Sequence, residues 1–246
     1  MMDRIGGQPW TVRSLFGRRY VLDTYQREYE WKRAHLQDLI NDLTTHYLSQ
    51  RKPEHELRDV ATFEPYFLGP IITHHAPNQT IIVDGQQRLT TLMLLLVWLH
   101  RLQADRDDAV PALDTLIVSD HFGHSEFAVE DPVMPRRPVL SALLGGHDVR
   151  LDRALTTSEK NLVARYTDID ELFPVDVQDD DLPFFIYWLL DRVVLVEIST
   201  RDSAFAVEAF ETMNDRGMRL GAADLLKSFL LNSARPADRP QINHLW

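Results

Sequence analysis

Five consecutive residues, Asp84-Gly85-Gln86-Gln87-Arg88, stand between two apolar stretches of the sequence. The pattern before them predicts a strand and the pattern after them predicts a helix, so they lie at a strand-to-helix junction. Glycine at such a junction can adopt a positive φ angle and lets the backbone approach a ligand closely. The first turn of a helix has N–H groups without intrahelical partners, and together with an arginine these groups form a natural phosphate site.

The same five residues also fit a second interpretation. Asp84 could cap the helix while Arg88 forms a surface ion pair. Thr90 and Thr91 add hydroxyl groups in the following turn without deciding between the two interpretations. The sequence does exclude a P-loop, because G-x-x-x-x-G-K occurs nowhere in the chain.

A second segment, residues 24–32, interleaves aromatic side chains with polar and basic ones. Its members of interest are Tyr25, Gln26, Arg27, Tyr29, Trp31 and Lys32. Stacking faces combined with basic groups are typical of base and nucleotide recognition, although the aromatic residues could instead fill the core next to a loop. The segment belongs to the one markedly basic part of the chain, residues 1–33, which ends at Arg33.

A third segment, residues 213–227, places Asn214 just before Gly217 and puts Asp224 and Lys227 three positions apart. Carboxamide and carboxylate oxygens could bind Mg²⁺ there and the lysine could bind phosphate. The alternative is a plain interhelical turn with an ion pair between residues i and i+3.

The elements that must position these segments follow from periodicity. Apolar residues three and four apart predict helices, and runs of β-branched and aromatic residues predict strands. The predicted helices span 34–50, 86–106, 158–173 and 182–190, and the predicted strands span 18–23, 66–74, 80–84 and 193–199, with 66–74 and 80–84 forming a hairpin. Residues 107–155 lack a clean hydrophobic period and predict loops and short helices. The acidic run 168–181 predicts a solvated connection. Residues 202–231 predict a helix, a polar turn and a second helix.

Composition limits the classes of function. The chain has 246 residues and a net charge of −11, which argues against a general nucleic-acid coat but allows a local basic site. Cysteine is absent, which excludes disulfides, thiolate nucleophiles and cysteine zinc sites. No secretory signal is visible, and the longest apolar run, 92–99, is far shorter than the roughly 20 residues that span a bilayer. We therefore expect a cytoplasmic protein without a membrane partner.

Together, the three segments resemble the domain family defined by its DGQQR motif. This family belongs to the ParB/sulfiredoxin-like fold group and includes GmrS of GmrSD-type restriction systems and the N-terminal domain of the SspE proteins. The matching stretches, in the family's order, are YQREYEW, YFLGPII, VDGQQRLTTLMLL and FETMNDRGMRLGAADLLK. They span residues 20–231, whereas 107–190 carries no match. One departure is Asp23, where the family usually has proline, and it puts the rigidity of that turn in doubt.

The resemblance implies an α+β fold: a small mixed β-sheet with packed helices, followed by a mostly helical part. We expect a ParB-like core over residues 1–106, an insertion of helices and loops over 107–190, and a strand with a helical pair over 191–246 that completes the domain. Because the sequence ends shortly after a proline-rich loop without a closing element, we also expect the natural chain to continue.

The resemblance further implies a domain that binds and hydrolyses GTP or ATP and regulates restriction of modified phage DNA. In this family the domain is often coupled to a His-Asn-His-type nuclease. GmrSD-like members act on DNA with glucosylated hydroxymethylcytosine, and SspE-like members respond to phosphorothioate DNA. The implied partners are thus modified DNA and a nuclease domain, while the modification, the nucleotide and homo-oligomerisation stay open.

The resemblance assigns residues 84–88 to the nucleotide site by position, puts residues 25–27 beside it or on DNA, and also matches Asn214 and Lys227. The residue types described above add Thr90, Lys32, Arg33 and the Mg²⁺ role of Asp84. The catalytic set is Asp84, Gln86, Gln87 and Arg88, with Asp84 as the Mg²⁺ ligand; the nucleotide-binding set is Gly85, Thr90, Asn214 and Lys227; the DNA-sensing set is Tyr25, Gln26, Arg27, Lys32 and Arg33. Two alternatives remain: a sensor module that binds DNA through the same turn and hydrolyses nothing, and a ParB-like domain that nicks DNA.

Overall fold

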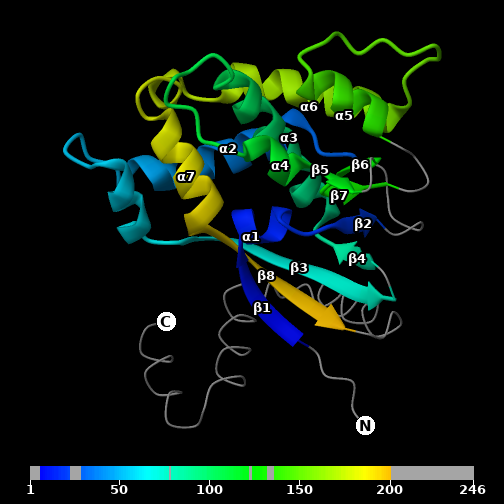
Figure 1. The fold of residues 1–246 in the computed structure, drawn as a ribbon, viewed down its shortest axis with the longest axis horizontal. Coiled ribbons are helices and arrows are strands. Elements are labelled where there is room, and N and C mark those ends of the chain that lie inside the picture. Colours follow the sequence, from blue (N-terminus) through cyan, green and yellow to red (C-terminus); the bar gives the residue numbers. More distant parts are fainter. Residues whose placement is uncertain (1–5, 23–28, 78, 122–123, 132–135, 201–246) are drawn as a thin grey trace.

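The computed structural model describes residues 6–22, 29–77, 79–121, 124–131 and 136–200. Over these residues the fold is α+β, as predicted, with one six-stranded mixed sheet and a layer of helices (Figure 1). The long helices lie on the same side of the sheet, so the core forms between the two layers (Figure 1). Residues 201–246, with the predicted pair of helices, lie outside the described residues.

The six-stranded sheet has the order β1-β8-β3-β4-β2-β7. Its strands are β1 (Gly6–Thr11), β2 (Tyr20–Leu22), β3 (Tyr66–Ala76), β4 (Gln79–Asp84), β7 (Val129–Glu130) and β8 (Val193–Thr200). The predicted hairpin is confirmed, because β3 and β4 pair antiparallel with Thr73 opposite Ile82. β8 comes last of these strands in the sequence and inserts between β1 and β3, antiparallel to β1 and parallel to β3. The division of the chain into three segments stays a prediction.

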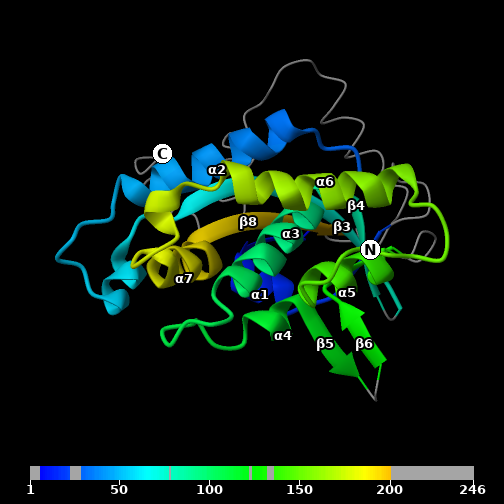
Figure 2. The same cartoon turned by 90° about the horizontal axis from the view of Figure 1, so that it is seen from above.

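The helical layer is built around α3. The helices are α1 (Val12–Phe16), α2 (Arg33–Leu48), α3 (Gln86–Leu102), α4 (Leu113–Ile117), α5 (Arg137–Leu144), α6 (Thr157–Leu172) and α7 (Leu182–Arg192), with 3-10 turns at Leu57–Thr62 and Val175–Val177. Every residue of α3 from Leu89 to Leu99 is buried, which is expected of a helix that is apolar all round. Figure 2 shows α3 in the middle of the layer, and α4, α5 and α6 pack against it.

The prediction of loops and short helices over 107–155 was wrong in part. β5 (Val118–His121) and β6 (His124–Phe127) form an antiparallel hairpin, and β7 extends the main sheet beside β2. Strands of two to four residues are too short to show a period of two, so only tertiary pairing defines them. β1 was also missed, since its glycines and Pro9 read as strand breakers; Pro9 is tolerated because β1 is an edge strand.

The predicted solvated connection over 168–181 also needs correction. Its first part is the last turn of α6, and Asp168 there is largely buried. Arg33 on α2 and Arg165 each reach the Asp168 carboxylate with a contact of 2.5 Å. The acidic run alone does not reveal this burial, because its basic partners Arg33 and Arg165 lie outside it.

The start of α6 gives a prediction about acid stability. Glu159 and Thr156 form a capping box, and hydrogen bonds from Arg153 together with those of the cap lower the pKa of Glu159 from 4.5 to about 2. A carboxyl group whose pKa is lower in the folded than in the unfolded protein stabilises the fold at pH values above the unfolded pKa. This stabilisation is lost as the pH falls towards the folded pKa. We expect Glu159→Gln to lower the free energy of unfolding at pH 7 and to lose that effect between pH 4.5 and 2. Urea unfolding of both proteins across this range measures it, and a constant difference would contradict the assignment.

Candidate anion-binding site at the start of α3

The predicted strand-to-helix junction is confirmed. β4 ends at Asp84, α3 begins at Gln86, and Gly85 between them has a φ angle of 93°. A Cβ atom at Gly85 would lie 2.6 Å from Cγ2 of Ile71 on the neighbouring strand β3. Glycine is therefore required here for two reasons, the positive φ angle and the close approach of β3.

Arg88 lies across β3 rather than pointing into solvent. Its Nη1 donates a 2.8 Å hydrogen bond to the carbonyl oxygen of Pro70. A Cβ atom at Gly69 would come within 3.2 Å of the same nitrogen, so Gly69 makes room for the guanidinium. Sequence reasoning missed Gly69, although a glycine inside a strand often marks a close approach or a bulge, and the pairing of β3 with β8 is irregular between Phe67 and Gly69.

The surroundings of Arg88 favour binding of an anion. Burial lowers the pKa of Arg88, and the charges of Asp84 and Tyr66 oppose this effect. Among the described residues no carboxylate forms a salt bridge with Arg88, and Pro70 is its hydrogen-bonding partner. A guanidinium has five N–H donors, so a half-buried one with a single neutral acceptor can still bind a phosphate. The interpretation of Arg88 as a surface ion pair is not supported by this geometry.

Two further residues of the site were missed by sequence reasoning. Tyr66, the first residue of β3, lies close enough for the charge of Arg88 to lower its pKa, although burial raises it overall. The charge of Asp42 on α2 also raises that pKa. Asp42, Tyr66, Arg88 and Asp84 thus form a polar row across α2, β3 and the junction. No sequence signal identifies it, because its members come from three separate elements.

The two glutamines of the motif have different surroundings. The Oε1 atom of Gln87 accepts hydrogen bonds from the backbone N–H groups of Glu30 at 2.9 Å and Trp31 at 3.2 Å. Gln86, the first residue of α3, is half-buried beside Gly85. The structure therefore brings the DGQQR motif together with the end of the aromatic and basic segment 24–32.

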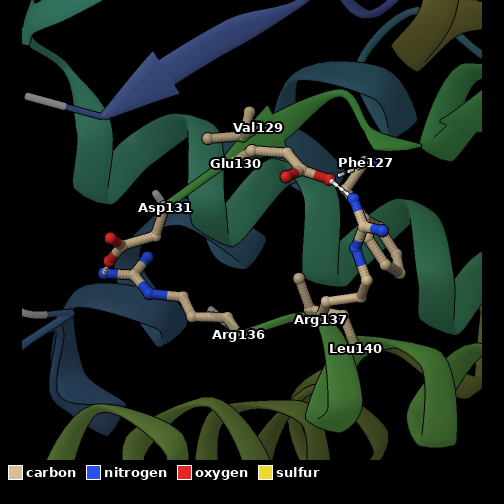
Figure 3. Close-up of a pocket in the computed structure, with 7 residues that line it drawn as sticks. All are labelled: Phe127, Val129, Glu130, Asp131, Arg136, Arg137 and Leu140. Carbon is tan, nitrogen blue, oxygen red and sulfur yellow. Dashed lines mark hydrogen bonds and ion pairs between the residues drawn. The ribbon is translucent and has the colours of Figure 1, made fainter. Parts of the chain in front are cut away.

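Thr90 lies on the buried side of α3. Its hydroxyl accepts a long hydrogen bond of 3.4 Å from Nη1 of Arg136, and both side chains are buried. Arg136 also contacts Asp131 at 3.5 Å on the wall of a cavity of about 340 Å³. In Figure 3 the pair Arg136–Asp131 faces the pair Arg137–Glu130 across this cavity. That Thr90 binds nucleotide stays a prediction.

The predicted DNA-sensing residues are only partly described. Arg33 contacts Asp168 at 2.5 Å and Glu171 at 2.6 Å, so its charge is already used inside the protein. Lys32, just before α2, is exposed and forms no salt bridge with any described residue. The other predicted site residues, Tyr25, Gln26, Arg27, Asn214 and Lys227, lie outside the described residues.

Metal and membrane features were also considered for the described part of the chain. Within it, no group of three or more His, Asp or Glu side chains is placed to hold a metal ion. None of the helices described there is long and apolar enough to cross a membrane. The predicted Mg²⁺ ligand, Asp84, is a single carboxylate at the end of β4.

The fold and the site define a class of protein, an α+β domain with a half-buried arginine at the start of a central helix. Its sequence matches the family model of the GmrSD restriction endonuclease N-terminal domain over residues 12–231. This match covers most of the chain, so the chain belongs to that family and is a domain of a restriction system, as the sequence motifs predicted. Among curated proteins, none matches the chain.

Proposed function

We propose that this domain binds and hydrolyses a nucleoside triphosphate at the junction 84–88 and thereby controls a nuclease of its restriction system. The observation that carries the proposal is the state of Arg88: a half-buried cation with one neutral hydrogen-bonding partner and no carboxylate partner among the described residues. A desolvated guanidinium beside a helix N-terminus is well suited to a phosphate group.

Each residue of the junction has a role in this mechanism. Gly85 brings the backbone N–H groups at the start of α3 close to the phosphates, and Arg88 stabilises the charge that develops on the transferred phosphoryl group. Gln86 orients the attacking water with its side-chain amide, since the oxygen of Gln87 is already bound to Glu30 and Trp31.

Asp84 is suited to holding Mg²⁺ together with the phosphates. Magnesium in nucleotide hydrolases is commonly bound by one or two carboxylates plus the phosphates of the substrate, so a single aspartate at the junction fits this chemistry. When bound, the ion would neutralise charge on the phosphates. Asp84 would hold the ion through its carboxylate at the end of β4.

Calorimetric titration of GTP and ATP into the protein without DNA, with Mg²⁺ present, tests the proposal. We expect one of the two to bind and to be turned over slowly. Binding without turnover would reduce the function to a nucleotide-dependent sensor. If neither nucleotide binds, the proposal is wrong, and DNA binding through Arg88 becomes the better explanation of its unused donors.

We further propose that the domain senses modified DNA through its basic N-terminal segment. Lys32 supports this part, being exposed and without a carboxylate partner among the described residues. We expect Lys32→Ala to weaken binding of modified DNA several-fold and to reduce the slope of log affinity against log salt by about one. Fluorescence anisotropy across a salt series measures both quantities. Unchanged binding by Lys32→Ala would exclude it as a DNA contact.

A matched comparison is available one residue further along the chain. Arg33 also belongs to the basic segment, but Asp168 and Glu171 neutralise it. We expect Arg33→Ala to change protein stability more than the salt slope of DNA binding. If both variants reduced the slope equally, the ion pairs of Arg33 would have to open when DNA binds.

A further inference from the structure

Gln87 stands at the centre of a set of hydrogen bonds that joins two separate sequence motifs. Its side-chain oxygen accepts from the N–H groups of Glu30 and Trp31, as described above. A carboxamide oxygen has two lone pairs, so both are used by these backbone groups. This oxygen is therefore not available to accept a hydrogen bond from an attacking water.

The main chain of Gln87 takes part in a second connection to the same segment. Its carbonyl oxygen accepts a 2.8 Å hydrogen bond from the hydroxyl of Thr91. The Thr91 oxygen lies 2.9 Å from the hydroxyl of Tyr29, which is fully buried. Because the one hydroxyl proton of Thr91 goes to Gln87, Tyr29 must donate to Thr91. Side chain and backbone of Gln87 are thus both tied to residues 29–31.

The segment 29–31 is itself fixed from its other side by α6. Asn161 donates to the Tyr29 carbonyl at 2.8 Å, and Arg165 donates to the Trp31 carbonyl at 3.0 Å. The N–H of Tyr29 donates to Ser158 at 3.3 Å. The first turn of α3 is therefore held against a segment that is itself anchored on α6 through three contacts.

From this arrangement we infer that Gln87 is a positioning residue. It fixes the first turn of α3, and with it Gly85 and Arg88, on the segment 29–31, and its side-chain oxygen does not act on the attacking water. The inference rests on the proposed nucleotide function and deepens it, because it separates the roles of two residues that the motif alone treats alike. It also means that a displacement of residues 29–31 changes phosphate binding.

Length-matched substitutions test the inference. Gln87→Met removes the hydrogen-bond acceptor without shortening the side chain. Tyr29→Phe removes only the Tyr29 hydroxyl, which is hydrogen-bonded to Thr91. We expect both variants to weaken binding of a non-hydrolysable nucleotide analogue, Gln87→Met by roughly tenfold and Tyr29→Phe by about threefold, because small displacements of a binding group are costly. In the double variant the losses should be less than additive, since both substitutions loosen the same attachment of α3 to residues 29–31.

Gln103 provides a matched control at the other end of the same helix. Its side chain also makes two hydrogen bonds to backbone, both 2.9 Å long and both to Val110. Gln103→Met should lower the melting temperature by an amount similar to that of Gln87→Met and leave nucleotide binding unchanged. This comparison separates an effect of lower protein stability on nucleotide binding from an effect of a displaced first turn of α3.

The outcomes distinguish the inference from the proposed function. If the unsubstituted protein binds no nucleotide, both are overturned. If it binds nucleotide and Arg88→Ala abolishes binding, while Gln87→Met and Tyr29→Phe bind like Gln103→Met, only the inference is overturned. A lower kcat in Gln87→Met with unchanged analogue binding, and no effect of Tyr29→Phe, would assign Gln87 to the water and would also overturn it.

Discussion

Arg88→Ala is expected to weaken nucleotide binding by roughly 100- to 1000-fold while leaving the folded protein as stable as before or slightly more so. Two lost hydrogen bonds to a charged phosphate amount to about 3–4 kcal/mol, and each 1.4 kcal/mol is a factor of ten. Stability should not fall, because burial lowers the pKa of Arg88 and the charges of Asp84 and Tyr66 offset its desolvation only in part. Calorimetric titration and urea unfolding of the same preparations measure the two effects.

Arg192 is the matched control for this prediction. It is half-buried, and its Nε donates a 2.6 Å hydrogen bond to the backbone carbonyl of Phe63, much as Arg88 does to Pro70. Arg192→Ala should therefore keep its nucleotide affinity, and any stability that it loses shows what the removal of such a bond costs. If Arg88→Ala destabilised the protein as Arg192→Ala does and kept its nucleotide affinity, Arg88 would be a structural residue.

Gly85→Ala is expected to have the largest effect on stability. An L residue in the left-handed region costs about 1–2 kcal/mol, and the new methyl group would approach Ile71 to 2.6 Å, which adds roughly 1–3 kcal/mol of overpacking. The sum of about 2–5 kcal/mol is a large share of the stability of an ordinary domain. Urea unfolding measures it.

Two other glycines serve as comparisons for the effect of Gly85→Ala. Gly17 has a φ angle of −70°, so Gly17→Ala should change stability by no more than about 1 kcal/mol. Gly69 also has a positive φ angle, so Gly69→Ala should share the backbone cost, but the new methyl group meets the end of the Arg88 side chain and should in addition disturb nucleotide binding. A cost for Gly85→Ala no larger than that for Gly17→Ala would contradict the described junction.

The strongest periodic features of the sequence predicted the fold well. The hairpin of β3 and β4, the long helices and the buried strand β8 occur within a few residues of their predicted bounds, although α3 ends at Leu102 rather than at 106. These elements have long apolar patterns or turn residues between them. β1 and β7 were missed because pairing with distant strands, rather than local pattern, makes them strands, and the hairpin of β5 and β6 was missed because its strands are too short to show a period.

The candidate site could be predicted only in its local part. The junction and Arg88 follow from the order strand, glycine, helix, whereas Tyr66 and Gly69 reach Arg88 from β3, and Asp42 on α2 acts on Tyr66. Gln86 and Gln87 look equivalent in the sequence, and only the fold places the oxygen of Gln87 on the backbone of residues 30 and 31. Contacts between distant segments decide these roles, and one sequence does not encode them locally.

A crystal structure with a non-hydrolysable GTP or ATP analogue and Mg²⁺ tests the central claim most directly. The prediction is that the triphosphate lies on the guanidinium of Arg88 and the backbone at Gly85, with the ion beside Asp84. The cavity lined by Phe127, Arg136 and Leu140, where Arg136 is hydrogen-bonded to Thr90, is the alternative place for the triphosphate. A triphosphate bound in that cavity, with Arg88 still directed only at Pro70, would contradict the account.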